Sequence, residues 1–249
     1  MSNLILHCGG KAATLDDLDT VPIPETTETY RAVPHREVAE FLKTLGGDLL
    51  TGYHLDRESY GLAREGQRMF GVQVYRDSNQ DMGMAVGFRN SYDKSMSLGI
   101  ALGASVFICD NLALAGDISI MKKHTPGIWE ELENLAIACF YRAVKTFRTV
   151  ERDAQTMQAL EIDNDQAYRF LGQLYGRDVL SVRQLPVASG EWRNPTHKIF
   201  EPRTLWSLYN ACTHSLKSSP PVSVMQNHAN LHDMVMNEKG LWSVAAQQD

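Results

Sequence analysis

"SYGLAREGQRMFGVQVYR", residues 59–76, is the stretch that decides the fold class. Two runs of β-branched, aromatic and other apolar residues flank Glu65-Gly66, where glycine can supply the positive φ that a tight hairpin needs. This pattern predicts two antiparallel strands. Further extended runs follow at 82–90, 96–108 and 112–121, with a turn at "SYDKS" (91–95). We therefore expect an antiparallel sheet of about five strands, with internal glycines marking bulges or close backbone approach.

Helices are predicted on both sides of this sheet region. "HREVAEFLKTLG" has apolar residues at helical spacing and predicts a helix over 35–45 that stops at Gly46-Gly47. Thr125 and Pro126 predict the start of a long amphipathic helix whose apolar face continues to Val150. Shorter helices are expected at 164–174, 203–217 and 222–238, and a proline-containing connector at 182–202.

The chain is predicted to be α+β, with the sheet packed on the long helix and further helices toward the C-terminus. Residues 1–34 contain glycines, prolines and a Thr/Glu run without periodicity, which predicts an extended N-terminal arm. Residues 35–249 are expected to form a single domain, with its sheet region at 48–121 and its helical region at 125–238. A chain of 249 residues is long enough to bury a core without disulfides.

Composition limits which binding partners and which cellular compartment we expect for this protein. The four cysteines (Cys8, Cys109, Cys139 and Cys212) form no Cys-x-x-Cys pair, which favours a reducing, cytoplasmic environment. No basic leader and no apolar run of about 20 residues is present, so no membrane association is expected. The net charge of −6 gives no global attraction to nucleic acid. The least acidic third is 57–125, with 8 basic residues against 7 acidic ones.

The sequence carries no strong catalytic signature. It lacks a GxxxxGK[ST] loop, a GxGxxG fingerprint and a GxSxG elbow, so no cofactor is expected. Cys109-Asp110-Asn111 interrupts an apolar run and is typical of a turn, because Asp and Asn side chains hydrogen-bond the backbone locally. The alternative, a nucleophilic or metal-binding Cys109, lacks a neighbouring base.

Two polar clusters remain open to a functional or a structural interpretation. Lys122-Lys123-His124 precedes the long helix and could seat a phosphate at the helix N-terminus, or be a solvated charge run. His228 and His232 lie one helical turn apart and could share a metal. Ala229 stands where the zinc-protease motif requires glutamate, so surface or capping roles are the alternative for this pair.

Several segments resemble the phage/plasmid-like proteins of unknown function, which are encoded in prophages and on mobile elements. The matching segments are "YGLAREGQRMFGV" (60–72), "FRNSYDKSMSLGIALGASVFICDN" (88–111), "KKHT" (122–125) and "TLWSLYNACTHSLK" (204–217). The family pattern has threonine or a similar residue at Asp110. The resemblance implies a role in mobile-element biology. The order of elements is also similar, as topology alone, to single-strand annealing proteins of phage recombination systems.

Three hypotheses follow. The first is a non-enzymatic protein that binds single-stranded nucleic acid in recombination or replication of a mobile element, as a homo-oligomer. Its phosphate-binding side chains would be Arg57, Arg64, Arg68, Arg76, Arg89, Lys94, Lys122, Lys123 and His124. Bases would stack on Tyr60, Phe70, Tyr75 and Tyr92, for which core packing is the alternative. The second hypothesis is an interaction module that inhibits a host defence protein. The third is a metal-dependent enzyme built on His228 and His232.

Overall fold

The predicted hairpin is present and forms the centre of the fold. The computed structural model describes residues 10–77, 82–106, 111–220 and 223–237. Strands β2 (His54–Ala63) and β3 (Arg68–Arg76) pair antiparallel, with Tyr60 opposite Gly71. At the turn, Arg64, Glu65 and Gly66 all have positive φ, of 54°, 56° and 87°. Glycine is therefore placed where the backbone is left-handed, as the sequence predicts.

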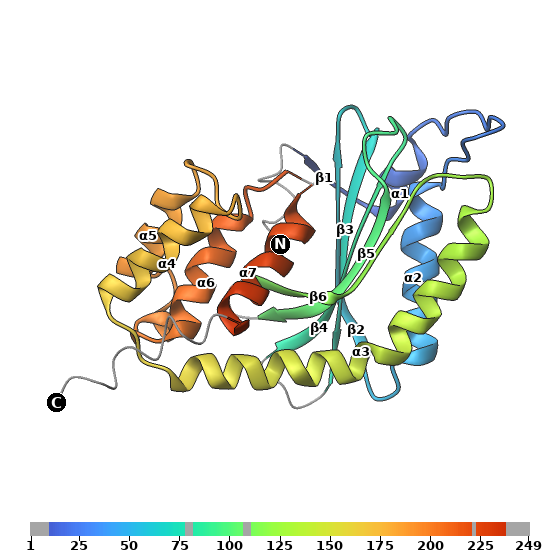
Figure 1. Ribbon diagram of the computed structural model, residues 1–249. Helices are drawn as coiled ribbons and strands as arrows, with labels where there is room; N and C mark the ends of the chain where they lie inside the picture. Colours follow the sequence, from blue (N-terminus) through green and yellow to red (C-terminus); the bar gives the residue numbers. More distant parts are fainter. Residues whose placement is uncertain (1–9, 78–81, 107–110, 221–222, 238–249) are drawn as a thin grey trace.

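The sheet is an antiparallel meander of six strands. β4 (Met82–Ser91), β5 (Leu98–Val106) and β6 (Asn111–Lys122) follow β3, and each strand pairs with its neighbour in the chain. The α+β class and the antiparallel sheet are confirmed, and residues 54–122 supply the five expected strands. A sixth strand, β1 (Lys11–Ala13), pairs with residues 60–62 of β2. Figure 1 shows the strongly twisted sheet between two groups of helices.

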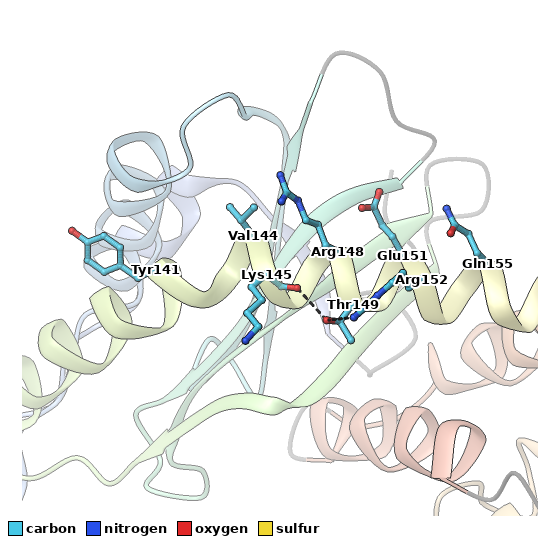
Figure 2. A pocket seen from close by; sticks show the side chains of 8 residues that line it. All are labelled: Tyr141, Val144, Lys145, Arg148, Thr149, Glu151, Arg152 and Gln155. Carbon is cyan, nitrogen blue, oxygen red and sulfur yellow. Dashed lines mark hydrogen bonds between the residues drawn. The ribbon is translucent and has the colours of Figure 1, made fainter.

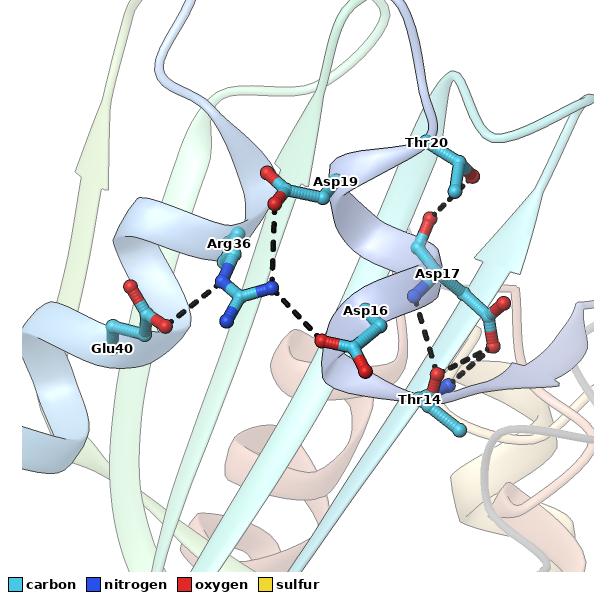
Figure 3. Close-up of polar contacts among 7 residues, drawn as sticks. All are labelled: Thr14, Asp16, Asp17, Asp19, Thr20, Arg36 and Glu40. Carbon is cyan, nitrogen blue, oxygen red and sulfur yellow. Dashed lines mark hydrogen bonds and ion pairs between the residues drawn. The ribbon is translucent and has the colours of Figure 1, made fainter.

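The N-terminal region contains regular structure that its sequence pattern does not predict. β1 is followed by helix α1 (Leu15–Asp19), whose first turn is closed by a capping box between Thr14 and Asp17. Arg36 holds α1 against the next helix, since its guanidinium contacts Asp16 and Asp19 at 3.0 and 3.3 Å (Figure 3). Residues 1–9 of the expected arm lie outside the described residues.

Helix α2 (His35–Leu49) covers one face of the sheet and is longer than predicted. The expected stop at Gly46-Gly47 is wrong, because the helix continues through both glycines. A Cβ on Gly46 would come within 3 Å of the phenol ring and hydroxyl of Tyr75 on β3. This glycine therefore allows a close approach between helix and strand instead of ending the helix.

Helix α3 (Ile128–Ala159) is a single rod of 32 residues across the same face of the sheet. It begins later than predicted, with Gly127 as its N-cap instead of Thr125, and it extends nine residues beyond Val150. The predicted apolar face is the buried face, and its most buried members are Leu132, Ala136, Phe140, Ala143, Phe147 and Val150. These side chains pack on the inward-facing residues of β4 and β5.

The C-terminal helices lie beside the sheet and on one side of α3, which α6 contacts (Figure 1). They are α4 (Asn164–Gly176), α5 (Leu185–Arg193), α6 (Leu205–Leu216) and α7 (Val224–Asn237). Helix α5 and a short 3₁₀ turn (Lys198–Phe200) lie in the segment predicted as a connector, with Pro186 in the first turn of α5, where proline is tolerated. Val224 and Met225 of α7 cover the second sheet face at Phe70, Val72 and Ala85.

Candidate nucleic-acid interface

The cations predicted on the sheet do not form one binding surface. Arg68 is ion-paired to Asp93 at 2.7 Å, and Lys122 is ion-paired to Glu131 at 2.9 Å. Arg89 is 8% exposed and points at the sulfur of Met121, and burial lowers its pKa. These three side chains are thus committed to contacts within the protein.

The remaining predicted cations are dispersed. Arg64 is exposed at the β2–β3 turn, whereas Arg57 and Arg76 lie toward the opposite end of the same hairpin. Lys94 lies over the ring of Tyr30, with its Nζ 4.5 Å from the ring centroid, and Lys123 is exposed in the loop before α3. Arg64 lines a hollow next to β1 and α1, together with Lys11 and Glu65, and this hollow includes none of the other four cations.

The four aromatic residues proposed for base stacking belong to the core. Tyr60, Phe70, Tyr75 and Tyr92 are each no more than 4% exposed. Phe70 contributes to the small cluster under α7, while Tyr60 and Tyr75 belong to the main core. This is the packing role that the sequence offered as the alternative, and a base could reach these rings only if the sheet opened.

His124 is also internal. Its Nε2 is 2.7 Å from the Oδ1 of the buried Asn90, and burial lowers the pKa of its imidazole. The turn predicted at Cys109-Asp110-Asn111 stays a prediction, because residues 107–110 lie outside the described residues. Asn111 is the first residue of β6.

His228 and His232 are both buried on α7. The Nε2 of His232 lies 3.1 Å from Asp153 of α3, and its Nδ1 lies 3.4 Å from the hydroxyl of Tyr209 of α6. Both ring nitrogens are therefore used to join three helices. Within the described residues there is no group of three or more His, Cys, Asp or Glu side chains placed to hold a metal. The geometry thus gives no support to the metal hypothesis.

A different surface brings cations and an aromatic ring together. Tyr141, Lys145, Arg148 and Arg152 occupy positions i, i+4, i+7 and i+11 of α3. Because an α-helix turns about 100° per residue, these side chains share one side of the rod. All four are exposed, and Tyr141 is 72% exposed. We call this set the α3 stripe; Figure 2 shows it along the helix.

An open hollow of about 710 Å³ lies over the α3 stripe. Val144, Thr149, Glu151 and Gln155 complete its lining. Within the described part of the chain, no carboxylate lies within ion-pair distance of Lys145, Arg148 or Arg152. The guanidinium of Arg152 makes a long hydrogen bond, 3.4 Å, to Thr149.

Glu151 is an acidic side chain in the lining of the same hollow. Burial raises the pKa of Glu151, although the charge of Arg148 opposes this rise. The carboxylate of the neighbouring Asp153 faces His232. The stripe is therefore a cationic surface with an exposed aromatic ring at one end, which is chemistry suited to an anionic, ring-containing ligand.

The fold and this surface define an α+β protein with a charged helical face. Residues 24–236 match the family described as Domain of unknown function (DUF932), and the chain belongs to this family. No curated protein and no solved structure matches the chain. Among the described residues, no helix is both long and apolar enough to cross a membrane.

Proposed function

We propose that this protein is a phage- or plasmid-type protein that binds single-stranded nucleic acid, and that the α3 stripe is its binding surface. The observation that carries the proposal is the alignment, on a single side of α3, of one exposed tyrosine and three cations that have no ion pair to any other described residue. The resemblance to mobile-element proteins supports a setting in recombination or replication.

The spacing of the cations suits an extended phosphate chain. Lys145, Arg148 and Arg152 follow one another at steps of about 4.5 and 6 Å along the helix axis, at about 1.5 Å per residue. Flexible Lys and Arg side chains on such a line can each meet one phosphate of a strand that runs along the rod. Protein affinity for phosphates then comes from counterion release and needs no net positive charge on the whole molecule, which carries −6.

Tyr141 favours a single strand over a duplex. Its ring is 72% exposed and lies one helical turn before Lys145. An aromatic ring can stack on a base only when that base is not stacked inside a duplex. The stripe thus offers one stacking platform followed by phosphate contacts.

The proposal is tested by titrating a fluorescently labelled oligothymidylate at two salt concentrations. Three phosphate contacts predict a slope of log K against log salt of about −2, which weakens binding roughly 20-fold between 50 and 200 mM salt. The variant K145Q/R148Q/R152Q should lose this binding and this slope.

A matched control variant removes the same number of positive charges from another part of the protein. Arg169, Arg183 and Lys198 are exposed on the C-terminal helical part, so R169Q/R183Q/K198Q should bind as the unaltered protein does. If both triple variants lost oligothymidylate binding equally, the loss would come from net charge alone and the α3 stripe would not be the binding surface. If the unaltered protein did not bind the oligothymidylate at low salt, the proposal would be refuted. A duplex of the same sequence should compete weakly.

A further inference from the structure

The segment before α2 is fastened to the sheet by a buried polar network of His35, Asn90 and His124, which we call the imidazole lock. His35, the first residue of α2, and Asn90, near the end of β4, are both 0% exposed. His124 lies in the loop between β6 and α3. The three side chains therefore connect parts of the chain that are far apart in the sequence.

The hydrogen bonds fix which atoms carry protons. The Nε2 of His35 lies 3.0 Å from the carbonyl oxygen of Gly66, which can only accept, so Nε2 carries a hydrogen. Its Nδ1 accepts from the Asn90 amide at 3.0 Å, and that amide also donates to the carbonyl of Val33 at 2.6 Å. His35 is thus neutral in this arrangement.

Rotating the Asn90 amide accommodates a second proton on His35 only at the cost of other hydrogen bonds. The Asn90 Oδ1 accepts from His124 at 2.7 Å and from the Ser91 backbone N–H at 3.0 Å. A flipped amide would place its oxygen against the Val33 carbonyl and its NH₂ against the Ser91 N–H. Without a flip, a proton on Nδ1 of His35 opposes the Asn90 NH₂ group. With a flip, the Asn90 oxygen could accept from that proton, but only together with the two unfavourable contacts to Val33 and Ser91. Protonation of His35 is therefore costly in either orientation, because buried polar groups without a matching partner are destabilising.

The surroundings supply no compensating charge. Within the described residues, no carboxylate is within ion-pair distance of either imidazole. The ring of His35 stacks on Tyr92 with centroids 3.8 Å apart, and Tyr30 lies 5.7 Å from His124. The other titratable or charged groups around these rings are Lys94 over Tyr30, the Arg68–Asp93 pair, Asp19 and Glu37. Burial lowers the pKa of His35 to about 4, with a smaller contribution from His124.

The imidazole lock holds residues 20–34, and this segment has a small apolar core of its own. Val21, Tyr30, Ala32 and Tyr92 form a separate apolar cluster, and Arg31 N–H donates to the His124 carbonyl at 3.2 Å. Val33, at the end of the segment, is buried in the main core, so the part with a core of its own is the stretch from Val21 to Ala32. Opening such a stretch locally costs less than global unfolding.

We infer that the imidazole lock is an acid-sensitive latch, and that protonation of His35 releases residues 20–34 and the β2–β3 turn while the sheet and α3 stay folded. This inference is independent of nucleic-acid binding, because the α3 stripe takes no part in the network. Val21 also lies directly under Gly66, so the segment and the turn should open together.

The test is amide hydrogen exchange measured at several pH values and corrected for the intrinsic rate. The opening constant of residues 20–34 should rise by up to about tenfold per pH unit between pH 6.5 and the lowered pKa of His35, hence about 40-fold between pH 6.5 and 4.5. Amides of α3 should keep their protection over this range. Exchange of 20–34 that is independent of pH, or opening of α3 in step with it, would overturn the inference.

Variants separate the lock from general acid effects. H35Q keeps one donor and one acceptor but does not titrate at this position, so its opening constant should lose the part of the pH dependence that comes from His35 and keep only the part that comes from His124. H54Q, at an exposed histidine of β2, should behave as the unaltered protein. If H35Q fails to fold, an NMR titration of the imidazole in the unaltered protein decides: a midpoint near 4 supports the latch and one near 6.5 refutes it.

Discussion

Tyr141 is exposed to an extent unusual for a large side chain on a packed helix, and its neighbours on the outer side of α3 are cations. If its ring stacks on a base, Y141A should weaken binding of the oligothymidylate about 5- to 150-fold, which corresponds to about 1–3 kcal/mol. Y141F should bind normally, since the ring and not the hydroxyl makes the contact. Fluorescence anisotropy provides the measurement.

Thermal denaturation of Y141A checks that the effect is local. An exposed ring contributes little to folding, so the stability of Y141A should change by less than about 0.5 kcal/mol. Y168A removes another exposed tyrosine, on α4, and should leave binding unchanged. Equal binding by Y141A and the unaltered protein would remove the stacking step from the proposal.

At the scale of single elements, α2 contains two adjacent glycines with opposite surroundings. G46A would place a methyl group against the buried ring of Tyr75, and we expect it to destabilise the protein by about 1–2 kcal/mol. G47A meets nothing within 4 Å and should stabilise it by up to about 1 kcal/mol through helix propensity. Urea unfolding of the two variants gives the comparison. If G46A and G47A both stabilised the protein, the close approach of Gly46 to Tyr75 would be contradicted.

Helix α7 is tied to α3 by a partly buried pair. The side chains of Asp153 and His232 are 19% and 8% exposed, and their contact is 3.1 Å long. A double-mutant cycle with D153N and H232Q should give a coupling free energy of about 1 kcal/mol. The exposed Arg36–Glu40 pair of α2 serves as reference and should give about 0.3–0.5 kcal/mol. A coupling for α7 no larger than the reference would mean that packing alone holds this helix.

At the scale of the whole molecule, one apolar core joins the sheet to the C-terminal helices. The cluster runs from Met69 and Phe88 on the strands through Phe140 to Leu174 and Trp192. We therefore predict that urea unfolding is a single transition, with far-UV circular dichroism and tryptophan fluorescence changing together. Trp129, Trp192 and Trp206 all lie in or against helices, so a separately unfolding helical part would appear as a fluorescence change at lower urea.

Much of this architecture could be predicted because it depends on local patterns. Alternation and a glycine turn mark β2 and β3, and the three- and four-residue spacing of apolar side chains marks α3. The glycines of α2 misled the prediction for a physical reason. Whether Gly46 ends a helix or admits Tyr75 depends on a strand 29 residues further along the chain, which no local pattern reveals.

The candidate site was less predictable, because charge pairing is a tertiary property. Arg68 and Lys122 read as exposed cations, but the fold brings Asp93 and Glu131 to them. Lys145 and Arg148 lie within a helix that continues to Ala159, and whether a carboxylate of another element comes within ion-pair distance of them is decided by the fold and not by the local sequence. The sequence signal that could have revealed the α3 stripe is the i, i+4, i+7, i+11 spacing from Tyr141 to Arg152, which places these residues on one side of a helix.

The order of the strands has a consequence for how the chain folds during synthesis. From β2 to β6 each strand pairs with the one made immediately before it. A ribosome releasing the chain from its N-terminus would thus expose every new strand beside a finished partner, and edges that could attract other nascent chains would stay short-lived. Only β1 must wait, since its partner residues 60–62 are translated after α2 is complete.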